Sequence, residues 1–212
     1  MRLITVQGEG KVTQSPDTIE LNVELVTLNK DYEKMMEEAI SKLNLLYYHL
    51  TSIGFDKNDI QTSDFTINAK YESVSDNVGN YKNEFVGYEA RQNIVLEFPM
   101  DIAFLGEAIG AITRSVVKPN ISIRFTIKDK QSVINDLLEN AVEDAINKAN
   151  ILASASGVKL GEVQTIDYKR QDYRIYSDTQ LMPNAMYSME KIDIVPKDIE
   201  LSEYVIMSFE IV

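Results

Sequence analysis

The sequence predicts an α+β fold in which a largely antiparallel sheet, or sheets, carries two long helices and one shorter helix on one face. Stretches with period-two alternation follow one another in pairs, which is typical of hairpins. Three other stretches place apolar residues three and four positions apart, which is typical of amphipathic helices. Strict strand–helix–strand alternation, the mark of a parallel sheet, is absent, and the expected element order is ββαββαβαββ.

The first two strands are expected at Leu3–Val12 and at 19–25, where Ile, Leu and Val alternate with Glu and Asn. The residues between them, Gln14-Ser15-Pro16-Asp17, are typical of a turn, so we expect the two strands to form a hairpin. Gly8 and Gly10 weaken the first strand and indicate a bulge or the close approach of another backbone.

The first long helix is expected from Lys30 to Ile53. Asn29 or Asp31 can cap its start, and Gly54 suits the left-handed position after its end. Its predicted buried stripe is Tyr32, Met35, Met36, Ala39, Ile40, Leu43, Leu46, Tyr47, Leu50 and Ile53.

A second hairpin is expected between a strand that begins at Ile60 and includes Phe65–Tyr71 and a long strand at Val86–Phe98. Residues 73–84 read as the loop that joins them, because Asp, Asn and Gly are frequent there.

The rest of the chain alternates helices and strands. Asp101 can cap a shorter helix that ends near Ser115, and a strand follows at Ile121–Ile127. A long helix is expected at 132–156, where repeated alanines on the buried face would let it lie close to a sheet. Short strands follow at 163–168 and at the C-terminus, over 205–211. The inward residues of the long helix are expected to be Ile134, Leu137, Leu138, Ala141, Ala145, Ala149, Leu152 and Ala153.

Composition narrows the classes of function. A chain of 212 residues makes one large domain or two small ones, and we predict a single domain over 1–212. The formal charge of −12, without a basic patch, argues against a nucleic-acid partner. The chain has no cysteine, which excludes disulfides and thiolate metal sites. His49 is the only histidine, so no pair of histidines can bind a metal, and we expect neither a catalytic role for His49 nor any cofactor.

Asp76, Asn77 and Asn80 surround Gly79 but lack the spacing of a calcium loop.

The chain has no apolar run long enough for a membrane span and no visible targeting segment. Met1-Arg2 leads directly into strand-like residues. We therefore predict a cytoplasmic location for the chain as it stands, and export if a leader had been removed from it.

Residues 170–200 lack helical or strand periodicity but are rich in tyrosine and methionine. These residue types are enriched at interfaces because they bury a large apolar area and adapt their shape. The segment could form an oligomer interface, cover the core of its own chain, or be disordered. If it is not the interface, the edges of the Leu3–Val12 or Val205–Val212 strands are the next candidates. The candidate interface residues are Tyr173, Tyr176, Met182, Met186, Tyr187 and Met189.

An ordered set of segments along the chain resembles the SIMPL-domain family, which includes bacterial periplasmic immunogenic and oxidative-stress-defence proteins. The resemblance covers about residues 3–212. It implies an α+β fold, a tendency to self-assemble and an association with envelope and oxidative-stress physiology, and it assigns no catalytic residue. The segments are Gly8–Val12, Ser15–Asp17, Gly54–Phe65, Gly87–Gln92, Lys148–Ala153, Gly157–Val163 and Val195–Glu200.

Two functions remain open at this point. The favoured one is a non-enzymatic assembly or binding module that acts as a homo-oligomer. The alternative is a small-molecule-binding protein, or an enzyme whose site is formed between subunits.

Overall fold

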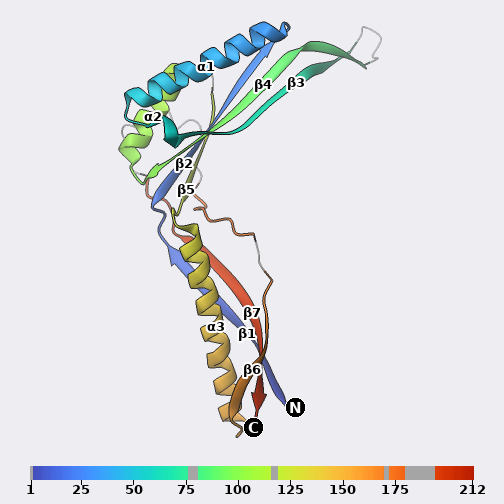
Figure 1. Ribbon diagram of the computed structural model, residues 1–212, viewed down its shortest axis with the longest axis vertical. Helices are drawn as coiled ribbons and strands as arrows, with labels where there is room; N and C mark the ends of the chain where they lie inside the picture. The colour runs from blue at the N-terminus through green and yellow to red at the C-terminus, as the bar shows by residue number, and fades with distance from the viewer. Residues whose placement is uncertain (1, 76–80, 116–118, 170–171, 180–193) are drawn as a thin grey trace. The chain divides into compact units, whose positions relative to one another are not determined.

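The computed structural model describes residues 2–75, 81–115, 119–169, 172–179 and 194–212. This part of the chain forms two compact units (Figure 1). Unit 1 contains the described residues of 1–17, 126–179 and 196–212, and unit 2 contains those of 18–125 and 180–195. The predicted α+β class and the element order ββαββαβαββ are confirmed, with one additional 3-10 turn. The prediction of a single domain over 1–212 stays a prediction.

Unit 1 is a three-stranded antiparallel sheet with one long helix on one face. The strand order is β1 (Leu3–Gln14), β7 (Ile199–Ile211), β6 (Leu160–Asp167), and α3 (Lys130–Ala155) packs on this sheet. The buried residues of α3 repeat every four positions: Val133, Leu137, Ala141, Ala145, Ala149 and Ala153. The predicted alanine-rich contact face is therefore confirmed, although Leu152 is exposed.

The glycines of β1 lie directly beneath α3. A Cβ atom on Gly8 would come within 2.0 Å of the carbonyl oxygen of Ala141, and one on Gly10 within 1.9 Å of the carbonyl oxygen of Leu137. Both distances are far shorter than any non-bonded contact, so only glycine fits at these positions. The close backbone approach expected at Gly8 and Gly10 is confirmed, and alanine on α3 is its counterpart.

Unit 2 is a four-stranded sheet with two helices packed on it (Figure 1). The strands, in spatial order, are β3 (Ile60–Ser75), β4 (Tyr81–Pro99), β2 (Thr18–Asn29) and β5 (Asn120–Thr126). The helices are α1 (Tyr32–Ser52) and α2 (Ile102–Ser115), and the 3-10 turn η1 (Lys57–Asp59) precedes β3. The core contains large side chains from both helices and from β2 and β4, among them Leu21, Val23, Leu46, Leu50, Ile94, Leu96, Leu105 and Ile112.

Aspartates cap α1 and α2 as the sequence predicts. The Asp31 carboxylate accepts hydrogen bonds from the backbone N–H groups of Glu33 and Lys34. Asp101 caps α2 in the same way. Gly54 follows α1 with φ of 109°, a conformation that other residues rarely adopt.

Three predictions about pairing and boundaries are wrong. The first two strands do not form a hairpin, because β1 pairs with β7 while β2 pairs with β4. The turn at 14–17 therefore leads from unit 1 into unit 2. The C-terminal strand β7 is not an edge, since β1 and β6 flank it. The expected loop at 73–84 is shorter, because β3 continues to Ser75 and β4 starts at Tyr81.

Candidate functional site

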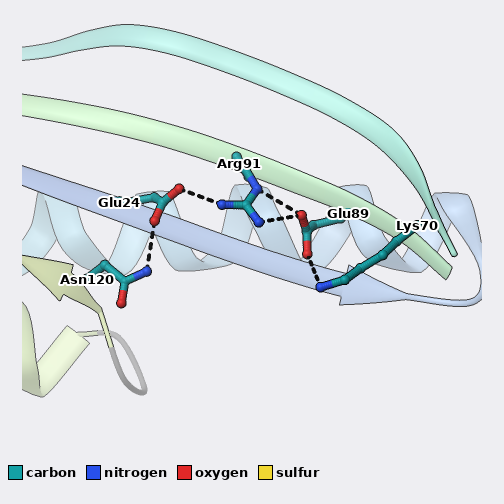
Figure 2. Close-up of polar contacts among 5 residues, drawn as sticks. All are labelled: Glu24, Lys70, Glu89, Arg91 and Asn120. Carbon is teal, nitrogen blue, oxygen red and sulfur yellow. Dashed lines mark hydrogen bonds and ion pairs between the residues drawn. The ribbon is translucent and has the colours of Figure 1, made fainter. Parts of the chain in front are cut away.

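A row of charged and polar side chains crosses the four-stranded sheet of unit 2 (Figure 2). We call it the charged ladder, and it consists of Glu24 from β2, Lys70 from β3, Glu89 and Arg91 from β4, and Asn120 from β5. Alternation along each strand puts these residues on the face opposite α1 and α2. On β2, for example, Leu21, Val23 and Leu25 are buried in the helix-covered core, so Glu24 points the other way.

Arg91 is the centre of the ladder. Its Nη1 lies 2.9 Å from Glu24 Oε1, and its Nε donates to Glu89 Oε1 at 2.8 Å. Lys70 Nζ is 2.7 Å from Glu89 Oε2, and Asn120 Nδ2 donates to Glu24 Oε2 at 2.8 Å. All four carboxylate oxygens thus accept a bond, and the contacts join the four strands of the sheet (Figure 2).

These contacts keep both glutamates ionised. The hydrogen bond from Lys70 lowers the pKa of Glu89 below its ordinary value, and Arg91 adds to this effect. The hydrogen bonds from Asn120 and then Arg91 lower the pKa of Glu24. A carboxylate with a lowered pKa and both oxygens engaged is a poor general acid and a weak base at neutral pH. The charged ladder is therefore suited to holding strands together and to presenting a polar surface.

A second polar cluster lies in unit 1, where α3 meets the outer edge of β1. Lys148 Nζ donates to the carbonyl oxygen of Gln7 at 3.1 Å, and the Glu9 N–H donates to Asp144 Oδ2 at 2.7 Å. Asn140 Nδ2 donates to the carbonyl oxygen of Lys11 at 3.1 Å. We call the three α3 side chains, Asn140, Asp144 and Lys148, the edge clamp.

The edge clamp can form because four residues of a helix and two residues of a strand advance by nearly the same distance. Residues four apart on a helix advance about 6 Å, and residues two apart on a strand advance about 6.6 Å. Side chains at every fourth position of α3 can therefore reach every second residue of β1. These bonds satisfy backbone groups that an edge strand otherwise leaves unpaired. The Lys148 ammonium and the Glu9 N–H both lower the pKa of Asp144, which keeps this carboxylate charged.

Glu203 is a buried carboxylate in unit 1, only 1 % exposed. The Tyr173 hydroxyl and the backbone N–H of Tyr204 both donate to it. Tyr173 also packs against the cluster of Ile127, Val133, Leu137, Ile175 and Ile199. The Tyr173–Glu203 contact thus attaches residues 172–179 to the sheet.

The structure describes two of the six candidate interface residues. Tyr173 is half-buried against its own unit, and Tyr176 forms a backbone bridge with Thr126. Met182, Met186, Tyr187 and Met189 lie outside the described residues. The assignment of this segment to an oligomer interface stays a prediction.

The remaining candidates contribute no assembled chemistry in the described part. His49 is half-buried in the last turn of α1, with its ring edge-on to Tyr48. Asp76, Asn77 and Asn80 lie outside the described residues. Within the described ranges, no three His, Asp or Glu side chains gather closely enough to hold a metal ion. A surface hollow of about 500 Å³ is lined by five residues, all from α1: Glu37, Ile40, Ser41, Asn44 and Leu45.

Sequence reasoning missed the charged ladder, the edge clamp and Glu203. Signals for two of them were present. Glu89 and Arg91 alternate within a predicted strand, and Glu203 occupies an inward phase of the C-terminal strand, where an apolar residue is expected. The edge clamp has no such signal, because polar residues at every fourth position of a helix also describe an ordinary solvated face.

Comparison with known sequences places the chain in a family. A sequence model described as "SIMPL: Protein of unknown function (DUF541)" matches residues 4–209, which span both units. The chain belongs to the SIMPL family. The resemblance found in the sequence is thereby confirmed. The description gives no function for the family, and in particular no reaction.

Two curated proteins are similar to this SIMPL chain. Both are named "26 kDa periplasmic immunogenic protein", one from Brucella melitensis biotype 1 and one from Brucella abortus strain S19. Each is 26% identical over 163 residues, which is 77% of this chain and 65% of the relative. The chain thus spans just under two thirds of the length of these relatives.

The predicted cytoplasmic location is wrong. Both relatives are named as periplasmic proteins, which points to export. The prediction relied on the strand-like start of the printed chain, and that start says nothing about residues that precede it. No helix in the described part of the SIMPL chain has the length and apolar character needed to cross a membrane.

Proposed function

We propose that this SIMPL chain is a non-enzymatic module that assembles with copies of itself outside the cytoplasm. The observation that carries the proposal is a group of exposed apolar side chains on the β3–β4 hairpin. Tyr71 is 59 % exposed and Tyr81 76 % exposed, and the group also contains Phe65, Val74 and Phe85. Such a concentration on one hairpin is typical of a surface that another molecule covers.

Charge limits what can cover this hairpin. The chain carries a formal charge of −12, so copies repel one another unless a specific contact overcomes the repulsion. The exposed apolar side chains of this hairpin can supply such a contact. Within each polar cluster that the structure describes, the charged groups bind one another or the backbone, which supports a structural use of these residues over a catalytic one.

The test is the mass of the protein in solution. We expect light scattering and native mass spectrometry to give a multiple of the chain mass of 24.0 kDa at tens of micromolar. A monomer under these conditions would contradict the proposal.

The tyrosine- and methionine-rich segment is proposed as a contributor to the assembly. We expect the combined change Tyr176→Ser and Tyr187→Ser to weaken association while circular dichroism reports an unchanged fold. An oligomer that the two changes leave intact would remove this segment from the interface and retain assembly through another surface.

The alternative is a protein that binds a small molecule. The observation in its favour is the hollow on α1, where Ile40 and Leu45 are exposed beside Glu37. Native mass spectrometry of the purified protein distinguishes the two functions, because a retained ligand adds a mass smaller than that of a chain.

A further inference from the structure

The outer edge of β3 has no described strand paired with it. β3 is the terminal strand of the four-stranded sheet, so only one side of it pairs with a described strand, β4. Its pairing is regular from Asp64 to Lys70, and register shifts interrupt it on either side of this stretch. We call residues 64–70 the open segment. It contains no proline, and its interior has no charged residue.

The outer edge of β1 is, by contrast, a strand edge whose backbone groups are bound by side chains. There the edge clamp binds the backbone of Gln7, Glu9 and Lys11. Among the described residues, no side chain donates to or accepts from the backbone of the open segment. Five of the seven residues of the open segment are polar or small, and the other two, Phe65 and Ile67, are large and apolar. An edge of this kind is a template for another strand.

The open segment is complementary to itself. If two copies pair antiparallel about Ile67, Asp64 of each copy lies opposite Lys70 of the other. This places an opposite-charge pair at both ends of the paired stretch. Asp64 forms no ion pair with another described residue, so its carboxylate is available for such a contact.

Both faces of the sheet would also match in this register. Ile67 would lie opposite Ile67, and Phe65 opposite Ala69, on the face that carries the apolar residues. Thr66 would lie opposite Asn68 on the other face, which is the face of the charged ladder. Side chains alternate strictly along a strand, so a shift by one residue would place apolar residues against polar ones.

We propose that the open segment, Asp64–Lys70, pairs with the same segment of a second copy, antiparallel and centred on Ile67. This proposal rests on the proposed self-assembly and names the surface and the partner that carry it. The occupant is a second copy because the charges of the open segment complement each other in that pairing. The two sheets would join into one continuous eight-stranded sheet across the contact.

Charge reversal at the two ends tests this register. Asp64→Lys alone should place lysine opposite Lys70, and Lys70→Asp alone should place aspartate opposite Asp64. Each variant should weaken self-association by on the order of 10-fold or more, measured by analytical ultracentrifugation. A mixture of the two variants should restore it, because every cross-strand pair is then between opposite charges.

Glu72→Lys is the matched control. It makes the same change in charge as Asp64→Lys on the same strand, but in the proposed register Glu72 faces Thr62, so association should be unchanged. If Glu72→Lys abolishes association while Asp64→Lys does not, the strands pair about Tyr71 and the proposed register is overturned. Thermal melts establish that each variant is folded. If Lys70→Asp unfolds because it loses Glu89, the comparison of Asp64→Lys with Glu72→Lys decides the question.

The outcomes separate this inference from the proposed function. A wild-type oligomer that survives both single reversals would overturn the pairing of the open segment and retain assembly through another surface. A wild-type monomer would overturn both.

Discussion

Both units pack helices on an antiparallel sheet. The contact in unit 1 uses small residues, whereas the contact in unit 2 uses large ones. In unit 1, α3 approaches β1 so closely that backbone meets backbone, with alanine above and glycine below. In unit 2, α1 and α2 stand off from the sheet on large side chains such as Leu46, Leu105 and Ile94. The close contact also brings polar side chains of α3 within reach of the β1 edge. In unit 2, no described helix side chain forms such bonds with the backbone of β3 between Asp64 and Lys70.

This difference predicts that a larger side chain at the helix–sheet contact destabilises unit 1, whereas a smaller side chain in the core destabilises unit 2. In unit 1 there is no space for another atom between α3 and β1, because the nearest neighbours of a new Cβ are backbone atoms. In unit 2 the core consists of side chains that fill space in the ordinary way, so removal leaves a cavity.

The largest effect is expected for Gly10→Val. The new side chain would overlap the backbone of Leu137, and α3 would have to move away from the sheet. We expect the free energy of unfolding to fall by about 4 kcal/mol or more, or the protein to fail to fold. Chemical denaturation followed by circular dichroism measures this.

Gly110→Ala is the control for a glycine without a close backbone neighbour. Its Cβ would meet only the flexible end of Arg114, at 3.3 Å, within α2. We expect the protein to become more stable by about 0.5–1 kcal/mol, because alanine favours the helix. Equal destabilisation by both substitutions would contradict the close contact of α3 with β1.

The second largest effect is expected for Leu46→Ala in unit 2. Leu46 is fully buried, and its truncation should lower the free energy of unfolding by about 2–5 kcal/mol. Leu45→Ala is the same change at the next residue, where the side chain is 47 % exposed, and should cost less than about 1 kcal/mol. Urea denaturation of both variants measures the difference. Similar losses would mean that α1 packs through another face.

A smaller effect is expected for Glu89→Gln in the charged ladder. The substitution weakens the bonds to Lys70 and Arg91, and Arg91 is 46 % exposed, so we expect a loss of about 1–2 kcal/mol at neutral pH. Because the pKa of Glu89 is lowered on folding, its stabilisation is complete above the ordinary carboxyl pKa of 4.5. It is lost as the pH falls through the lowered pKa of the folded state.

The pH dependence is the decisive measurement for the charged ladder. The difference between wild type and Glu89→Gln, taken from denaturation at a series of pH values, should shrink as the solution becomes acidic. A difference that grows with acidity would contradict the lowered pKa of Glu89. Glu72→Gln is the control, since Glu72 is exposed and lies outside the charged ladder.

The smallest effect is expected for His49→Gln. His49 is half-buried at the end of α1, and its one described ring contact is with Tyr48. We expect the free energy of unfolding to change by less than about 0.5 kcal/mol. Thermal melts at neutral pH measure this, and a loss above about 2 kcal/mol would assign His49 to the core of unit 2.

The sequence by itself determined the elements of this protein. Period-two and period-3.6 patterns predicted every strand and helix, Asp31 and Asp101 were candidate caps for α1 and α2, and Gly54 marked the end of α1. Gly8, Gly10 and the alanines of α3 also indicated close backbone contacts, because only small residues permit them. These signals are local, since each depends on the conformation of one short stretch of chain.

Only the tertiary structure decided which elements meet. Glu9 and Tyr204 contact one another although they are 195 positions apart in the sequence, and nothing in the pattern of β1 distinguishes β7 from β2 as a partner. The charged ladder draws on four strands and the edge clamp on a helix and a strand, so neither exists as a sequence motif. Alternation specifies which side of a strand is buried. The alternation of a strand is the same whichever strand lies beside it. The choice of neighbour, and with it the open edge of β3, is therefore settled only when the whole core packs.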